Sequence, residues 1–354
     1  MNLDALTSTT GEWLRGTGAE SDIVISTRIR LARNLASFPF TNRATQHQKT
    51  EIESVLRDRV TKLDLPHPLG YLNVTVLGSL DRQLLVERQL ISRELANAEG
   101  PRGVAFDQRE AVSIMINEED QLRMQVMRSG LALDLAWHEI DHIDDLLEAK
   151  ISYAWHEQYG YLTACPTNVG TGMRASVMAH LPALGLTRQL EKVFRSLQKI
   201  NLVVRGLYGE GSRASGDFFQ ISNQITLGRS ETTALSELQG VIAKILAYER
   251  QARGALLQEK RLELQDRVSR ALGALQHATM MTSDETMELL SSVRMGINLG
   301  LLDDISMQTV NELFIQTQPS HLQKLVGGPL DGEERNAARA RYLRTRLRRT
   351  GHEI

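Results

Sequence analysis

Hydrophobic and polar residues alternate, or β-branched residues accumulate, in several short runs between residues 22 and 228. Such runs are typical of β-strands, and the segments between them have helical spacing. This part of the chain is therefore predicted to be α+β. The strand-like runs are DIVISTRIRL (22–31), GYLNVTVLGSL (70–80), EAVSIMINEE (110–119), INLVVRGLYG (200–209) and DFFQISNQITLG (217–228).

After residue 230 the pattern becomes that of amphipathic helices. Apolar residues recur there every three or four positions, at Leu235, Leu238, Ile242, Ile245 and Leu246. Thr282 with Glu285, and Asp331 with Glu334, have the spacing of reciprocal helix N-caps. We therefore expect further helices near 283–298, 305–317 and 331–349.

A chain of 354 residues is long enough for two domains. The change of pattern places a soft boundary near 250–256. We predict an N-terminal segment at 1–21, an α+β domain at 22–253 and a helical domain at 254–354.

Composition excludes several classes of protein. No run approaches the eighteen or so apolar residues of a membrane-spanning helix, and the first twenty residues lack the basic and apolar regions of a secretory signal. A cytoplasmic protein without membrane contact is expected. The single cysteine, Cys165, excludes an internal disulfide and a multi-cysteine zinc site. The arginine-rich end of the chain is a candidate for binding anions.

The first candidate site lies in VISTRIRLARN (24–34). Arg28 and Arg30 are two residues apart in a strand-like run, so their side chains project to the same face. One interpretation is an edge strand that carries charge to prevent pairing. The other is an anion site, because forked guanidinium donors match phosphate oxygens.

The second candidate is SIMINEEDQLRM (113–124), where a strand runs into Glu118, Glu119 and Asp120, with Arg123 after them. A solvated acidic turn is one explanation. The alternative is a site for a cationic substrate, or for Mg²⁺ that keeps most of its water.

The third candidate, residues 159–184, runs from a strand-like segment through Cys165 and a glycine-containing loop into a predicted helix. Gly170, Gly172 and Ala175 superficially fit a dinucleotide fingerprint, but the acid expected about twenty residues later would be Glu191, inside a helical pattern. The loop could still offer N–H groups to phosphate at the helix start, beside Arg174. A lone cysteine is more often an inert core residue than a functional one.

The fourth candidate is the glycine-rich segment 203–223, bracketed by Arg205 and Glu210. It is either a long surface hairpin or a loop that closes over a ligand. A further pattern, H-E-x-x-H at His138, Glu139 and His142, has zinc-protease spacing. We discount it, because acids crowd the segment and it is predicted to be an exposed helix face.

Together these segments resemble the ATP:guanidino phosphotransferases, or phosphagen kinases, and most closely their bacterial protein-arginine kinase branch. The segments that carry the resemblance are NEED (117–120), CPTNVGTGMRAS (165–176) and RGLYGE (205–210). It covers residues 20–250 and part of the C-terminal tail. It implies an antiparallel sheet flanked by helices, of the glutamine-synthetase and guanidino-kinase type, followed by a helical C-terminal domain.

The resemblance also implies roles for individual residues. Glu119 would be the catalytic carboxylate, Glu210 a second carboxylate on the guanidinium, and Cys165 the cysteine beside the same group. As a thiolate, Cys165 could hold the guanidinium electrostatically without attacking it. Mg²⁺ would be carried by ATP, with Glu118 reaching it through water. The implied nucleotide contacts are Ser26, Thr27, Arg28, Ile29, Arg30, Gln89, Arg123, Arg174, Ala175, Ser176, Val177, Met178, Arg205, Gly206, Leu207, Tyr208, Gly209 and Glu210.

The chemistry agrees with these roles. A guanidinium keeps its proton until a positioned base removes it, because its pKa is above ~12. Two carboxylates can align the planar cation and one of them can serve as the base. Positioned arginines and Mg²⁺ stabilise the charge of the transferred phosphoryl group.

The sequence departs from the pattern of this branch in several places. Gln89 and Gln121 stand where histidines are usual. RNAARA (335–340) resembles the phosphoarginine-reading motif of the branch, with Asn336 in place of aspartate, and suggests an allosteric site at Arg335, Asn336, Arg339 and Ala340. A solvated basic helix is the alternative. Arg28 comes early in the chain, so we expect no preceding helical domain and an open site suited to a protein side chain.

The resemblance implies protein substrates with exposed arginines, a Clp-type chaperone and protease that degrade the marked proteins, a small zinc-binding activator, and a homodimer. No nucleic-acid partner is expected. Two other functions stay open: a kinase of free arginine or another small guanidino compound, and a non-catalytic adaptor that binds phosphoarginine.

Overall fold

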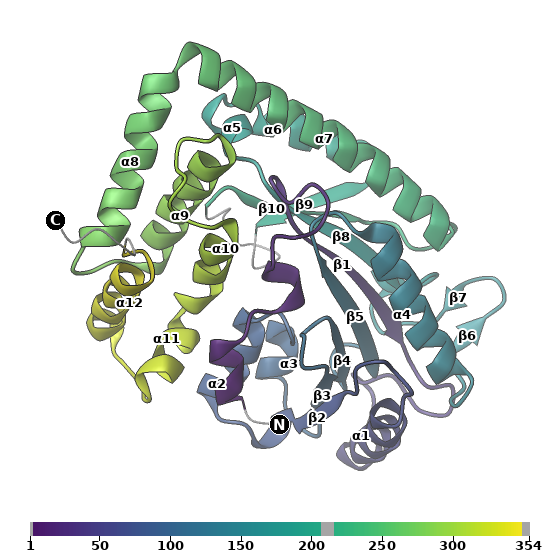
Figure 1. Cartoon of the computed structure of the whole chain (residues 1–354). Coiled ribbons are helices and arrows are strands. Elements are labelled where there is room, and N and C mark those ends of the chain that lie inside the picture. The colour runs from purple at the N-terminus through teal and green to yellow at the C-terminus, as the bar shows by residue number, and fades with distance from the viewer. Residues whose placement is uncertain (1–2, 207–215, 349–354) are drawn as a thin grey trace.

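An eight-stranded antiparallel sheet forms the centre of the molecule (Figure 1). The protein is described here from a computed structural model, which covers residues 3–206 and 216–348. The strand order is β2-β3-β4-β5-β1-β8-β10-β9. The strands are β1 (Val24–Arg33), β2 (Gly70–Asn73), β3 (Gly103–Phe106), β4 (Val112–Ile116), β5 (Leu122–Ser129), β8 (Met173–His180), β9 (Leu202–Gly206) and β10 (Phe218–Asn223). The pair β6 (Trp155–His156) and β7 (Gly160–Tyr161) forms a separate hairpin.

Strand β1 lies inside the sheet, between β5 and β8, and is not an edge strand. The alternative that Arg28 and Arg30 protect an exposed edge is therefore wrong. Both neighbouring strands pair with β1 in antiparallel register, with Arg30 opposite Gln125 of β5 and Arg174 of β8. Directly opposed residues in a sheet share a face, so this register gathers polar side chains on one face.

The other face of the sheet is apolar and is covered by helices. Ile29, Leu31, Val126 and Val177 are fully buried there against α1 (Gln46–Thr61), α4 (Leu133–Glu148) and α7 (Glu231–Glu259). The short helices α5 (Pro182–Leu186) and α6 (Leu190–Gln198) pack at the β9 end. Burial of this face stabilises the sheet that positions the polar face.

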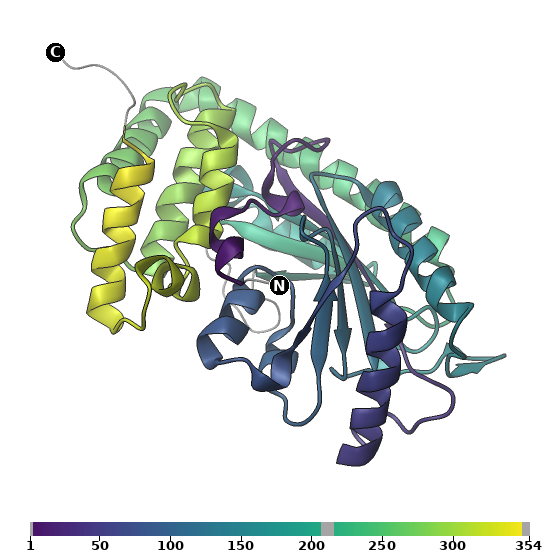
Figure 2. The same ribbon diagram turned by 60° about the horizontal axis from the view of Figure 1, so that its bottom comes forward.

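Two groups of helices cover parts of the polar face and leave its middle open (Figure 2). Near β3 and β4, α2 (Ser79–Glu87) and α3 (Arg93–Asn97) pack on Val104, Phe106 and Met115. At the opposite end, Ile25, Met127, Met178 and Phe218 contact Trp13 and the C-terminal helices. Those helices are α8 (Arg261–His277), α9 (Ser283–Asn298), α10 (Met307–Gln316), α11 (Pro319–Val326) and α12 (Gly332–Arg346).

The predicted C-terminal helices and their caps agree with the structure. Thr282 accepts the Glu285 N–H at the start of α9, and Asp331 with Glu334 forms a reciprocal cap on α12. The predicted boundary at 253/254 falls inside the continuous helix α7. The division of the chain into these domains stays a prediction. The remaining short elements are the 3-10 helices η1 (Asp4–Ser8), η2 (Glu12–Leu14), η3 (Val74–Val76) and η4 (Pro166–Asn168).

One predicted element is wrong. The segment after Gly172 is the strand β8, not a helix, so no helix N-terminus lies beside Arg174. Alanine and methionine give this segment a high helix propensity, but β1 and β10 pair with it on both sides and most of its residues are buried. A strand covered on both faces shows no clear alternation, which is why the pattern was ambiguous. The run at 70–80 is also only partly a strand, since β2 ends at Asn73.

No helix within the described ranges is long and apolar enough to cross a bilayer.

Candidate active site

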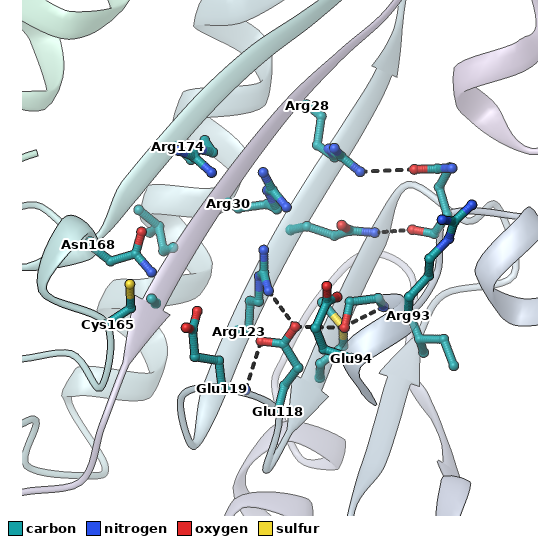
Figure 3. A pocket seen from close by; sticks show the side chains of 18 of the residues that line it. Arg28, Arg30, Arg93, Glu94, Glu118, Glu119, Arg123, Cys165, Asn168 and Arg174 are labelled. Carbon is teal, nitrogen blue, oxygen red and sulfur yellow. Dashed lines mark hydrogen bonds and ion pairs between the residues drawn. The ribbon is translucent and has the colours of Figure 1, made fainter. Parts of the chain in front are cut away.

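A cavity of about 830 Å³ lies over the open middle of the polar sheet face. The strands form its floor, and α3, the acidic turn (residues 117–120) and the Cys165 segment (residues 162–171) form its walls. Figure 3 shows guanidinium groups gathered over the strands, with Glu119 and Cys165 beside each other at one end. The arginines that line the cavity are Arg28, Arg30, Arg93, Arg123, Arg174 and Arg205.

The partly buried arginines of the floor repel one another. Burial, together with the charges of Arg123 and Arg174, lowers the pKa of Arg28 to about 10. Burial and the same neighbours, with Arg28, also lower the pKa of Arg30 well below its ordinary value. Arg30 Nε is buried without a hydrogen-bond partner among the described residues. Such a cluster favours a polyanion, whose oxygens would neutralise the charges and accept the remaining N–H groups.

Gln89 lies at the rim of this cluster, in place of the histidine of the related branch. It follows the end of α2 with a left-handed backbone (φ 62°), and its Oε1 accepts a hydrogen bond from Arg28 Nη1 at 3.1 Å. Its carbonyl oxygen accepts a bond from Gln125 Nε2 at 2.5 Å. Gln89 therefore orients Arg28 and lines the cavity.

The acidic turn begins at Asn117, whose φ of 57° is left-handed. The Asn117 amide stabilises this conformation by donating to the carbonyls of Lys49 and Pro101, each at 2.9 Å. Glu118 is buried, forms an ion pair with Arg123, and accepts hydrogen bonds from Ser92 Oγ (2.6 Å) and the Glu119 N–H (2.9 Å). Burial alone would raise the pKa of Glu118, but the charge of Arg123 and the hydrogen bonds from Arg123, Ser92 and the Glu119 N–H together outweigh burial and lower it.

Glu119 differs from Glu118 because it is exposed to the cavity. The surrounding protein still removes part of the water around the Glu119 carboxylate, which raises its pKa, and the negative charges of Glu118 and Asp120 raise the pKa further. A hydrogen bond from the Cys165 side chain opposes this rise. Cys165 Sγ also lies 3.0 Å from Thr167 Oγ1. The turn therefore presents one carboxylate of raised basicity beside a thiol, next to a cluster of cations.

The other predicted nucleotide contacts lie on both faces of the sheet, because successive side chains of a strand point to opposite faces. Ser26, Ser176 and Met178 face the same side as Arg28 and line a small depression that adjoins the cavity. Thr27, Ile29, Ala175 and Val177 are fully buried away from the cavity. Gly206 ends β9 and is not part of the cavity lining. Leu207, Tyr208, Gly209 and Glu210 lie outside the described residues.

Gln121, the second departure from the usual histidine, does not line the cavity. It is fully buried, accepts the Leu35 N–H at 2.7 Å and donates to the Pro39 carbonyl at 2.8 Å. Its position indicates a structural contact with the loop after β1.

The predicted phosphoarginine residues lie on α12. Arg339 is buried and donates hydrogen bonds to the carbonyls of Thr317 and Met281 and to Asn336 Oδ1, each at 2.8 Å. Arg335 is partly exposed and donates to the Leu330 carbonyl at 2.9 Å. Ala340 is buried in the core of the C-terminal helices. In this structure Arg339 supports the packing of α12.

The H-E-x-x-H residues lie on α4, which packs against β1 and β5 and contributes no residue to the cavity lining, and both histidines are exposed. Glu139 pairs with Arg128. Within residues 3–206 and 216–348, no group of three or more His, Cys, Asp or Glu side chains is placed to hold a metal ion.

Several lining residues were not predicted from the sequence. Gln125 and Gln220 line the cavity from β5 and β10, in register with Arg30 and Arg205. Both glutamines alternate with apolar residues, and this alternation indicates that they share the face of Arg28 and Arg30 once β1 is known to lie in the same sheet. Ser92, Arg93 and Glu94 enter from α3, and nothing local in the sequence marks this short helix as a cavity wall.

Two family models match the chain. Residues 51–252 match the ATP:guanido phosphotransferase C-terminal catalytic domain, and residues 261–353 match the protein-arginine kinase McsB C-terminal domain. The chain is 45% identical to a protein-arginine kinase of Halothermothrix orenii, over 97% of this chain and 98% of the relative. It is also 45% identical to the Bacillus subtilis protein-arginine kinase, over 97% and 94% of the two chains.

Solved structures give the same fold. A duplicated taurocyamine kinase from Schistosoma mansoni matches with a TM-score of 0.61 and 26% identity, over 66% of this chain and 34% of the other. A lombricine kinase matches with a TM-score of 0.60 and 24% identity, over 72% of each chain. With the family matches and the near full-length relatives, these findings show that the chain belongs to the ATP:guanido phosphotransferase family, in its protein-arginine kinase branch.

Proposed function

We propose that this protein transfers the γ-phosphoryl group of Mg-ATP to the guanidinium group of arginine side chains in other proteins. One observation carries the proposal most directly: a cluster of partly buried arginines and an exposed carboxylate of raised basicity meet in one cavity. The cations suit the phosphates of ATP, and the carboxylate suits a cationic acceptor. The relatives named protein-arginine kinase support the same acceptor.

The cations of the floor would bind and orient the nucleotide. Arg28, Arg30 and Arg174 stand side by side on two paired strands, so a triphosphate laid across them would meet a donor at each phosphate. The transferred group carries its charge on equatorial oxygens, and fixed donors stabilise that charge without rearrangement. We assign these three arginines, with Arg123 and Arg205, to the phosphates.

Glu119 would take the proton from the acceptor. A guanidinium nitrogen has no available lone pair while its proton is present, so a base must act as the new P–N bond forms. The P–O bond to ADP then breaks, and ADP leaves with the bonding electrons. Cys165 would hold the guanidinium beside Glu119. Glu210, the proposed second carboxylate, lies outside the described residues.

Mg²⁺ would arrive on the ATP phosphates and neutralise part of their charge. The carboxylate oxygens of Glu118 are already engaged by Arg123, Ser92 and the Glu119 N–H. A contact from Glu118 to the ion would therefore pass through water, as the resemblance implies.

The finer biological roles are also proposals. We propose that phosphorylation marks proteins with exposed arginines for a Clp-type chaperone and protease, and that a small zinc-binding protein activates the kinase. We further propose a homodimer and an allosteric phosphoarginine site around Arg335, Asn336, Arg339 and Ala340. The match of residues 261–353 to a protein-arginine kinase domain supports a role for this region specific to that branch.

A comparison of acceptors tests the proposed function. The protein is incubated with Mg-ATP and either casein or free arginine, and the products are analysed by mass spectrometry at neutral pH. We expect phosphoarginine in casein and little on the free amino acid. Product on free arginine alone would identify a small-molecule guanidino kinase. ATP-independent binding of phosphoarginine without any product would identify an adaptor.

A further inference from the structure

Two buried polar residues that do not line the cavity lie directly behind its reactive end. Asn34 follows the last residue of β1 and is 1% exposed, and Asp120 ends the acidic turn and is 2% exposed. Neither side chain reaches the cavity. Polar side chains are buried at a cost unless their hydrogen bonds are satisfied, so their contacts indicate what they hold in place.

Their hydrogen bonds join three separate segments. Asn34 Nδ2 donates to Asp120 Oδ1 at 2.7 Å and to the Leu162 carbonyl at 3.1 Å, while Asn34 Oδ1 accepts the Gln121 N–H at 2.9 Å. Asp120 Oδ1 also accepts the Ala164 N–H at 2.7 Å. The end of β1, the acidic turn and the Cys165 segment are therefore fastened at one point, which we call the Asn34–Asp120 clasp.

The position of the clasp in the chain gives it a particular consequence. Asp120 is the residue after Glu119, and Ala164 is the residue before Cys165. One hydrogen bond thus joins the immediate neighbours of the two groups that face the guanidinium. Burial raises the pKa of Asp120, and its bonds to Ala164 and Asn34 oppose that rise. These donors stabilise the charged form of the Asp120 carboxylate, which holds the end of β1 and the Cys165 segment together.

Gln121 provides a comparison within the same structure. It is buried next to Asp120, and both hydrogen bonds of its side chain go to the loop after β1 rather than to the Cys165 segment. Truncating Gln121 removes two buried hydrogen bonds, as truncating Asn34 removes several, without opening the junction between Glu119 and Cys165.

We propose that Asn34 and Asp120 are positioning residues, which set the separation of Glu119 and Cys165 for in-line transfer to a guanidinium. The proposal rests on the proposed function for the roles of Glu119 and Cys165. The hydrogen bonds of the clasp go to the acidic turn and to the Cys165 segment and not to the arginine side chains of the floor. The clasp therefore acts on the acceptor end of the site and leaves the nucleotide end unchanged.

Kinetics of Asn34→Ala, with Gln121→Ala as the matched control, test the proposal. A misplacement of about 1 Å costs on the order of 10²-fold in rate, so we expect kcat for protein arginine to fall by about that factor in Asn34→Ala. The KM for ATP should stay within about threefold of the unmodified protein, a change below ~0.7 kcal/mol. Gln121→Ala should keep both constants. A loss of ATP affinity equal to the loss of kcat, or an equal fall in Gln121→Ala, would overturn the proposal.

A second readout does not depend on catalysis. Cys165 is the only cysteine, so its alkylation by iodoacetamide reports on the Cys165 segment without background. We expect faster alkylation in Asn34→Ala, because the thiol moves away from the Glu119 carboxylate, and an unchanged rate in Gln121→Ala. An unchanged rate in Asn34→Ala would contradict the clasp even if the protein phosphorylates nothing. Faster alkylation in Asn34→Ala, from a protein that phosphorylates no arginine, would instead support the clasp and contradict the proposed function.

If Asn34→Ala does not fold, the conservative variant Asp120→Asn still tests the proposal. Asparagine keeps an oxygen that can accept from Ala164 and Asn34, whereas Asp120→Ala does not. Asp120→Asn is expected to keep kcat and the alkylation rate within about threefold, and Asp120→Ala to lose kcat by on the order of 10²-fold. Loss of activity in Asp120→Asn equal to that in Asp120→Ala would show that the charge itself is required, and would overturn a positioning role.

Discussion

At the scale of single residues, the site combines like charges that repel one another. Arg28 and Arg30 are partly buried near other cations, and both have a lowered pKa from loss of solvent and from like charges. Buried charges without counter-ions reduce the stability of the fold. The arrangement is understandable if a polyanion binds there, because the ligand supplies the missing charge and oxygen acceptors.

Replacing Arg30 by methionine should therefore raise stability and remove nucleotide binding. Arg30→Met keeps the volume and removes one buried charge, so the thermal midpoint should rise by about 2–4 °C, on the order of 1 kcal/mol. Mg-ATP should raise the midpoint of the unmodified protein but not of this variant. Differential scanning fluorimetry measures both effects. Arg128→Met, on the opposite face of β5 and paired with Glu139, should still respond to Mg-ATP. A destabilised Arg30→Met that still binds ATP would contradict the assignment.

The raised pKa of Glu119 predicts the acid limb of the pH–rate profile. A base must be deprotonated to act, so activity should fall as the pH drops through the Glu119 pKa, and this pKa lies above the ordinary 4.5. Initial rates at saturating Mg-ATP, with folding checked by circular dichroism at each pH, measure the limb. An acid limb at or below pH 4.5 would exclude a Glu119 with this environment as the base. Glu119→Gln should lose most activity at every pH.

At the scale of secondary-structure elements, much of the sheet could be predicted from sequence. β1, β4 and β10 appear as alternating or β-branched runs, and the caps at Thr282 and Asp331 locate two helices. The strand β8 could not be distinguished from a helix, because its alanines and methionines favour a helix locally and only pairing with β1 and β10 decides otherwise. A local sequence pattern does not show which distant segments pair with one another.

The junction between α2 and α11 gives a pH-dependent prediction. Glu87 ends α2, is buried, and accepts the N–H groups of Ser320 (2.9 Å) and His321 (3.0 Å) at the start of α11. Burial raises its pKa to about 7 from 4.5. A raised pKa contributes stability that is present below the unfolded value and is lost as pH rises through the folded value.

The unmodified protein should therefore lose stability relative to Glu87→Gln as the pH rises from about 5 to 8, by roughly 1–3 kcal/mol. Urea unfolding midpoints of both proteins across this range measure the difference. A constant difference, or one that favours the unmodified protein at high pH, would contradict a raised pKa for Glu87.

At the scale of the whole molecule, one sheet face serves two purposes. Its ends are apolar and pack against α2, α3 and the C-terminal helices, while its middle is cationic and forms the cavity floor. The arginines of the floor and the acidic turn could be predicted from motifs, because paired arginines in a strand and NEED are local features. Ser92, Arg93 and the Asn34–Asp120 clasp could not, since their roles depend on tertiary contacts between residues 26 to 128 positions apart.

The most direct test of the account follows one phosphoryl group from ATP to protein. The protein and its Glu119→Gln variant are incubated with Mg-ATP and casein, and ADP release and phosphoarginine are both quantified at neutral pH, which preserves the acid-labile P–N bond. We expect equal amounts of ADP and protein-bound phosphoarginine for the unmodified protein, and a loss of both in Glu119→Gln. ADP release without phosphoarginine, or undiminished phosphoarginine in Glu119→Gln, would contradict it.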